Sequence, residues 1–220
     1  MIVFLTGGTG FIGQPLTRQL LSRGWEVTAL VRKPDSAQAR ALNQLGARCV
    51  AGDITDRESV RAGMTGADLV LHNAGWYELG VTAEAKKRMQ AINAGGTDKV
   101  LSLAQELEVP RTVYVSSLVA FGDTGKQLRD ETFQRQAPCV SAYEQSKTDA
   151  HIVAQQYQQR GLPLIIVCPG QVIGPNDHAP WGYFARLYAN GLLPPMAWAA
   201  DSVQAHAGVE DIAEGIALAA

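Results

Sequence analysis

The stretch MIVFLTGGTGFIG, residues 1–13, decides the fold of this chain. Ile2–Thr6 is a short apolar run typical of a β-strand, and glycines follow it at once at positions 7, 10 and 13. Apolar residues then recur at helical spacing, at Ile12, Leu16 and Leu20. The pattern predicts a strand, a glycine turn and a helix. Glycines so placed let backbone amides approach a pyrophosphate and let the helix pack closely, so a dinucleotide phosphate fits there, although an ordinary tight turn is the alternative.

The remainder of residues 1–170 repeats this strand-and-helix unit. Further strands are predicted over Glu26–Val31, Ala47–Ala51, Leu69–His72, Arg111–Ser116 and Leu164–Cys168. Between them lie helical segments, among them Ala83–Leu107 and a helix opened by a Thr55/Glu58 capping box. Strands that alternate with helices predict an α/β fold of Rossmann type, with a doubly wound parallel sheet. Ligands bind such a sheet at the carboxyl ends of its strands, where the glycine turn lies.

Tyr143 and Lys147 lie four residues apart at the start of another predicted helix. Ser141 and Glu144 form a capping box for this helix, and Gly161 is a suitable stop after Arg160. Residues at i and i+4 share one helix face, so the Lys147 ammonium is expected to favour the Tyr143 phenolate and to make the tyrosine a usable acid or base. A Tyr-x-x-x-Lys pair also arises by chance, so it indicates a catalytic site only in combination with the other motifs.

Taken together, the motifs resemble the extended short-chain dehydrogenase/reductases, the NAD-dependent epimerase/dehydratase family. The resemblance rests on Thr6–Gly13, Gly52-Asp53-Ile54, His72-Asn73-Ala74-Gly75, Asn93 with Gly96-Thr97, Val115-Ser116-Ser117, Tyr143 with Lys147, and Cys168-Pro169-Gly170. These segments span nearly the whole chain and form a specific set. Within the family, the chain looks most similar to dihydroflavonol and cinnamoyl-CoA reductases and to 3β-hydroxysteroid dehydrogenases.

The resemblance implies catalytic roles for four residues. Tyr143 would exchange a proton with the substrate oxygen, and Lys147 would hold the nicotinamide ribose. Ser117 would hydrogen-bond the carbonyl oxygen; it is chosen over Ser116 because the family's serine precedes the next glycine, here Gly122, by five positions. Asn93 would shape the proton-relay end of the site, although asparagine within a helix is also commonly structural.

The resemblance also implies a nicotinamide dinucleotide site. Its residues would be Gly7, Gly10, Phe11, Ile12, Gly13, Arg32, Lys33, Asp53, Ile54, Ala74, Tyr143, Lys147, Pro169 and Val172. Asp53 matches the acid that contacts adenine in relatives. At the end of the second strand, NAD-preferring relatives carry an acid where this chain has Val31, and NADP-dependent reductases carry arginine where it has Arg32. We therefore expect NADP(H), with NAD as the alternative and with Arg32 and Lys33 as plain surface charges in that case.

The composition is that of an enzyme with a single core. The chain has 220 residues, 46% of them hydrophobic, which is enough for a substantial core. Its net charge of -2 lacks the excess positive charge that is typical of nucleic-acid-binding proteins. Cys49, Cys139 and Cys168 form no disulfide framework, and no metal-ligand spacing occurs. No stretch is long enough for a signal peptide or a membrane span. We expect a cytoplasmic protein without nucleic-acid or membrane partners; relatives often dimerise, so a homodimer is a further expectation.

The last part of the sequence departs from the family. Residues 171–220 are expected to be a small, incomplete substrate-binding part, in which Trp181, Tyr183, Phe184 and Tyr188 line a pocket or are plain core. The segment from Gly208 resembles one that opens with histidine in relatives. Relatives continue for roughly a further small domain, so the chain is either a fragment or a shortened form with an open site.

Three functions remain open from the sequence. The first is an NADP-dependent reductase or dehydrogenase that acts on a ketone, an aldehyde or a secondary alcohol. The second is a nucleotide-sugar epimerase that retains NAD, which would more usually have an acid at the end of the second strand. The third is a non-catalytic dinucleotide-binding sensor, which would generally have lost the tyrosine or the lysine. The identity of the substrate does not follow from the sequence.

Overall fold

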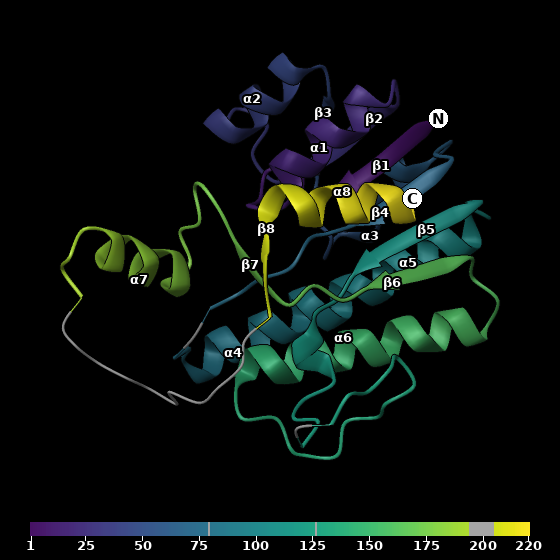
Figure 1. Cartoon of the computed structure of the whole chain (residues 1–220). Coiled ribbons are helices and arrows are strands. Elements are labelled where there is room, and N and C mark those ends of the chain that lie inside the picture. The colour runs from purple at the N-terminus through teal and green to yellow at the C-terminus, as the bar shows by residue number, and fades with distance from the viewer. Residues whose placement is uncertain (79, 126, 194–204) are drawn as a thin grey trace.

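A six-stranded parallel sheet forms the centre of the molecule, in the order β3-β2-β1-β4-β5-β6 (Figure 1). The computed structural model describes residues 1–78, 80–125, 127–193 and 205–220. The strands are β1 (Ile2–Thr6), β2 (Glu26–Val31), β3 (Arg48–Ala51), β4 (Leu69–His72), β5 (Arg111–Val115) and β6 (Leu164–Val167). They agree with the predicted strands to within one residue at each end. The order reverses between β1 and β4, which is where ligands bind doubly wound sheets, and the predicted α/β fold is confirmed.

Helices cover both faces of this sheet (Figure 1). One face carries α1 (Gly13–Ser22), α2 (Ala37–Leu45) and α8 (Val209–Ala219), and the other carries α3 (Arg57–Met64), α5 (Gly96–Glu106) and α6 (Ala142–Gln159). Side chains alternate along each strand, so Val3 and Leu5 enter the first apolar layer while Phe4 enters the second. Because both faces are buried, the strands read as continuous apolar runs rather than as alternating ones.

The carboxyl-terminal segment is divided between the sheet and the region beyond it. Helix α8 packs against α1, and its Ala213 and Ile216 are fully buried in the first apolar layer. A small parallel pair, β7 (Gln171–Ile173) and β8 (His206–Gly208), precedes it. Helix α7 (Pro180–Ala189) buries no residue and lies away from the sheet (Figure 1). Helix α8 thus packs with the unit that the sequence assigned to residues 1–170. A substrate-binding role for the other residues of 171–220 stays a prediction. Residues 194–204 lie outside the described residues.

Two helix starts were predicted from capping boxes, and one prediction is wrong. The Ser141 hydroxyl accepts a hydrogen bond from the Glu144 amide at 3.1 Å, as expected for the N-cap of α6. At α3, however, the N-cap is Asp56, whose carboxylate accepts from the Glu58 amide at 3.1 Å. Thr55 turns toward Asp53 instead, and its amide and hydroxyl both donate to the Asp53 carboxylate. Two adjacent capping residues cannot be ranked by sequence alone.

The long helix expected over Ala83–Leu107 contains a π-helical turn. It consists of α4 (Ala83–Gln90), the π turn Ala91–Gly95 and α5. A π turn inserts one residue into the helical register, so the side chains after it are rotated relative to those before it. It places Asn93 almost fully buried between the loop after β4 and helix α6.

The three cysteines are unpaired, as the sequence predicted. Within the part of the chain that the structure describes, no helix is long and apolar enough to cross a membrane. The same residues contain no group of three or more His, Cys, Asp and Glu side chains that could hold a metal ion.

A buried polar row crosses the sheet just below its carboxyl edge. Thr6, His72 and Tyr114 are register partners on β1, β4 and β5. The Thr6 hydroxyl lies 2.7 Å from His72 Nδ1, and His72 Nε2 lies 3.0 Å from the Thr97 hydroxyl, which donates to the Asn93 carbonyl at 2.6 Å. Because Thr97 donates onward, the network assigns the His72 proton to Nε2. Burial, reinforced by the charge of Lys147, lowers the pKa of His72 to about 3.

The row predicts acid sensitivity of the fold. Between pH about 6.5 and about 3 the unfolded chain binds a proton at residue 72 and the folded chain does not, so the free energy of unfolding falls as the pH falls through this range. His72→Phe retains the ring stacked on Tyr114 and should make this acid loss shallower by about 1.4 kcal/mol per pH unit, the slope of one proton.

Urea unfolding between pH 3 and 7 measures this slope. His178→Phe, at an exposed position, is the matched control and should follow the parent protein. Equal slopes for the parent protein and His72→Phe would show that residue 72 is not held neutral by the fold.

Candidate active site

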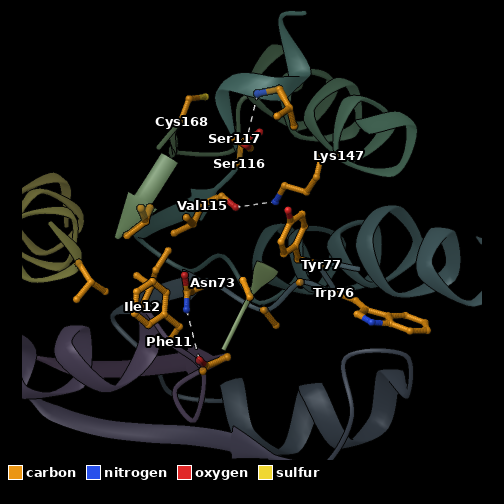
Figure 2. Close-up of a pocket in the computed structure, with 18 of the residues that line it drawn as sticks. Phe11, Ile12, Asn73, Trp76, Tyr77, Val115, Ser116, Ser117, Lys147 and Cys168 are labelled. Atoms are coloured by element: carbon orange, nitrogen blue, oxygen red, sulfur yellow. Dashed lines mark hydrogen bonds between the residues drawn. The ribbon is translucent and has the colours of Figure 1, made fainter. Parts of the chain in front are cut away.

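An open cavity of about 1910 Å³ lies at the carboxyl ends of the strands (Figure 2). It exceeds the usual volume of a pocket for one small ligand, about 300–1,000 Å³, so a dinucleotide and a second molecule both fit. Twelve predicted site residues line it: Gly7, Gly10, Phe11, Ile12, Arg32, Asp53, Ile54, Ala74, Ser117, Tyr143, Lys147 and Val172. Four do not: Gly13, Lys33, Asn93 and Pro169. The structure thus brings most of the predicted set together from segments far apart in sequence.

The glycine bend is packed too closely to accept side chains. Gly7 has φ +74°, and a Cβ there would lie 2.7 Å from the Ala74 amide nitrogen. A Cβ on Gly13 would lie 2.0 Å from the Gly7 carbonyl oxygen, so Gly13 serves the approach of α1 to the bend rather than the cavity wall. Figure 2 shows Asn73 directed at the same bend, where its amide donates to the Gly7 carbonyl at 3.4 Å. No acidic side chain occupies the first turn of α1, so its positive end can receive an anion.

Lys147 is a buried cation in the opposite wall of the cavity (Figure 2). Its Nζ donates to the Val115 carbonyl at 3.1 Å and to the Tyr114 hydroxyl at 3.5 Å, and it lies 5.2 Å from the centre of the Tyr114 ring. Among the residues that the structure describes, no carboxylate forms an ion pair with it. Burial lowers the pKa of Lys147 to about 8, and Cys168 acts in the opposite direction. The lysine is therefore poised to change charge near neutral pH.

Tyr143 lies in the first turn of α6 and lines the same cavity. Its ring meets that of Tyr77 edge-on, with centroids 4.7 Å apart. Burial raises the pKa of Tyr143, and its interaction with the Ser117 side chain lowers it only in part. The expectation that the ammonium dominates and lowers the pKa of Tyr143 is wrong for this structure, because burial of the phenol outweighs the groups that favour the phenolate. At neutral pH the phenol is protonated.

The two serines after β5 point in different directions. Ser116 follows Tyr114 by two residues and shares its side of the sheet, where its hydroxyl lies 2.9 Å from His151 Nδ1 on α6. Both serines line the cavity, but Ser117 has left the strand and interacts with Tyr143 rather than with His151. Its hydroxyl also accepts from the Val119 amide at 3.4 Å, at the start of a 3-10 turn (Leu118–Ala120). The geometry favours Ser117, the residue chosen from the sequence, as the one that can reach a substrate.

Asn93 acts on the site through the backbone of Trp76. Its Oδ1 accepts from the Trp76 amide at 2.7 Å, and its Nδ2 donates to the Trp76 carbonyl at 2.9 Å and to the Ser146 hydroxyl at 2.8 Å. With these three bonds its side chain is occupied. Asn93 therefore fixes the loop after β4 to α6, and a direct catalytic role remains only a prediction.

The far end of the cavity carries Arg32 and Asp53. The Asp53 carboxylate accepts from the amide and the hydroxyl of Thr55 at 2.8 and 2.7 Å. Burial raises the pKa of Asp53, but these bonds and the charges of Arg32 and Arg88 outweigh it and hold the pKa below its ordinary value. Asp53 is thus an anion at neutral pH. Lys33, next to Arg32, is exposed and lies outside the cavity lining.

Several residues of the site were missed by the sequence reasoning. The role of the Val115 carbonyl could not be predicted, because every residue has a backbone carbonyl and the residue type does not mark this one. Tyr114 could have been found, since it lies two residues before Ser116 and alternation along β5 puts both on the side of α6. Arg88 gave no signal because a basic residue near the end of a helix is ordinary.

Of the aromatic residues Trp181, Tyr183, Phe184 and Tyr188, which were expected to line a pocket or to be plain core, one lines the cavity, together with two aromatic residues of the loop after β4. Trp76, Tyr77 and Trp181 line the cavity. Tyr183 and Tyr188 are 54% and 77% exposed, so they are not plain core. The cavity mouth is therefore partly aromatic.

Comparisons with known proteins identify the family to which the chain belongs. The sequence matches the NAD dependent epimerase/dehydratase family over residues 3–220. It is 37% identical over 179 residues to a putative dihydroflavonol 4-reductase of Synechocystis sp., which covers 80% of this chain and 51% of that protein. It is 32% identical over 200 residues to a 3 beta-hydroxysteroid dehydrogenase/Delta 5→4-isomerase of Mycobacterium tuberculosis, covering 86% of this chain and 51% of that protein.

A solved structure shares the architecture. The dTDP-glucose 4,6-dehydratase DesIV of Streptomyces venezuelae, solved with NAD bound, superimposes with a TM-score of 0.84 at 26% identity, covering 100% of this chain and 72% of that one. The chain thus spans about half the length of the two curated relatives named above, at 51% each. The match over residues 3–220 shows that the chain belongs to the NAD dependent epimerase/dehydratase family, as the motifs had indicated.

Proposed function

We propose that this chain binds NADP(H) and serves an oxidoreductase that interconverts a ketone or aldehyde and the corresponding alcohol. One observation carries the proposal: Tyr143, Lys147 and Ser117 line the same cavity as the glycine bend. Reductase and dehydrogenase relatives support this reaction type. The NAD-bound dehydratase of the same fold supports a nicotinamide dinucleotide in this cavity.

The cavity fits such a cofactor. A side chain on Gly7 would meet the Ala74 backbone, and one on Gly13 would meet the Gly7 carbonyl. Glycines at both positions therefore keep the bend and the start of α1 close together, as backbone amides that meet a pyrophosphate require. Asp53 and Ile54 would border the adenine, and Val172 would lie on the nicotinamide side. The bound cofactor supplies or accepts the hydride.

Tyr143 would serve as the proton donor in the reducing direction. Because burial raises its pKa, the phenol holds its proton at neutral pH and can give it to the oxygen of a carbonyl as negative charge develops there. The Ser117 hydroxyl would donate a second hydrogen bond to the same oxygen and orient it. In the oxidising direction the phenol must first lose its proton, so that direction should gain rate as the pH rises.

Lys147 would act on both the ribose and the tyrosine. With its Nζ held by the Val115 carbonyl, the ammonium stands at a fixed place in the wall, where it can donate to a ribose hydroxyl. Its positive charge favours the Tyr143 phenolate once the proton has left. Because the pKa of Lys147 is about 8, this effect weakens above that pH unless the bound cofactor raises the value.

NADP(H) is preferred over NAD(H) in this proposal because of Arg32. The guanidinium lines the cavity at the end of β2, where relatives that use NAD carry an acid, and it can bind a 2′-phosphate. An epimerase that retains NAD and a sensor without turnover are the alternatives, and cofactor choice and turnover separate them from a reductase.

Tyr143→Phe tests the chemistry. Removing only the hydroxyl should lower kcat for carbonyl reduction by about 10²- to 10⁴-fold, the usual contribution of a general acid. The dissociation constant for NADP+ should stay near that of the parent protein. Tyr183→Phe, on the exposed side of α7, is the matched control. The measurement is reduced-cofactor absorbance over a panel of ketones and aldehydes, with calorimetry for binding; undiminished turnover in Tyr143→Phe would contradict the mechanism.

Cofactor preference is tested by titrating NADP+ and NAD+ separately. The parent protein should bind NADP+ more tightly, and Arg32→Gln should weaken NADP+ by about tenfold or more because a charge-assisted contact to phosphate is lost. Arg40→Gln makes the same charge change outside the cavity lining and should leave both constants unchanged. A tenfold or greater preference of the parent protein for NAD+ would overturn the assignment of NADP(H).

A further inference from the structure

Arg88, on the cavity-facing side of α4, is a cation that the proposed function does not use. Arg88 and Ile92 line the cavity one helical turn apart. Gly96, further along the same continuous helix, packs so closely on Ile54 that a Cβ there would lie 2.7 Å from Ile54 Cδ1. This helix is therefore anchored beside the end of β3, and Arg88 lies nearer its N-terminus, in the cavity lining.

The Arg88 side chain is held in place by Trp76. Its guanidinium carbon lies 5.6 Å from the centre of the indole ring, within the range of a cation–π contact. The Trp76 backbone is in turn fixed on both sides by Asn93. The arginine is thus positioned at the cavity edge, and among the described residues no carboxylate forms an ion pair with it.

The charges at this end of the cavity indicate what Arg88 does. Asp53 is an anion and would repel the 2′-phosphate of NADP(H). Arg32 offsets that single negative charge and leaves the end neutral, whereas Arg32 and Arg88 together leave it with one positive charge. All three side chains line the cavity, and the charges of both arginines help to hold the pKa of Asp53 below its ordinary value. A phosphate dianion needs the second cation more than a 2′-hydroxyl does.

We propose that Arg88 is a specificity-determining residue that, with Arg32, selects the 2′-phosphate of NADP(H) against the 2′-hydroxyl of NAD(H). The inference rests on the proposed function, because it concerns the same cofactor site. Its basis is the position of Arg88 in the cavity lining, its fixation on Trp76 and the charge balance with Asp53 and Arg32.

The experiment measures the ratio of the dissociation constants for NAD+ and NADP+ in the parent protein and in three variants. Arg88→Gln should lower the ratio by about tenfold, the effect of one charge-assisted phosphate contact. Arg88→Lys keeps the charge and should restore most of the ratio. Lys87→Gln removes one positive charge from the neighbouring position of the same helix, which does not line the cavity, and should change the ratio by less than about twofold.

Each outcome decides for or against Arg88. A ratio that falls in Arg88→Gln and recovers in Arg88→Lys supports the inference. An unchanged ratio, or an equal loss for both cofactors, overturns it, because a structural or adenine-contact role would not distinguish the two. The two proposals are tested by different numbers. The ratio in the parent protein tests the assignment of NADP(H), which a preference for NAD+ would refute. The change of that ratio between the parent protein and Arg88→Gln tests the role of Arg88.

Discussion

The buried ammonium of Lys147 is the constraint on which the site depends. An unpaired cation is costly to remove from water, and no carboxylate among the described residues offsets it. The Val115 carbonyl and the ring and hydroxyl of Tyr114 provide its partners. These groups exist together only where β5 ends against α6. The same contact therefore fixes the first turn of α6, with Tyr143, beside the chain that leaves β5, with Ser117.

The sheet supports this contact from below. The row Thr6, His72 and Tyr114 links β1, β4 and β5 at one level, directly under the glycine bend and the lysine. His72 stays neutral there because burial and the nearby ammonium both oppose its protonation. A polar row in a core is tolerable because its members find partners in one another and in Thr97. The cradle at β1 and the reactive groups at β5 are thus parts of one connected structure.

Local signals made most of the fold predictable, and long-range contacts account for what was missed. The strands and the glycine bend were readable because apolar runs and glycines act within a few residues. The choice of Asp56 over Thr55 as a cap is a local exception, set by the contact between Thr55 and Asp53. The packing of α8 on α1, by contrast, depended on a segment about 200 residues away along the chain. The candidate residues were found by type and spacing. Their hydrogen-bond partners, such as the Val115 carbonyl for Lys147 and the Trp76 backbone for Asn93, were not encoded in any motif.

The most direct test of this account is the pKa of Lys147, measured by NMR in protein with carbon-13-labelled lysine and assigned with Lys147→Met. The account predicts a value near 8 in the free protein, well below the ordinary lysine value of about 10.4. A value at or above the ordinary one would mean that the amine stands in water and that the contact between β5 and α6 does not hold the site together.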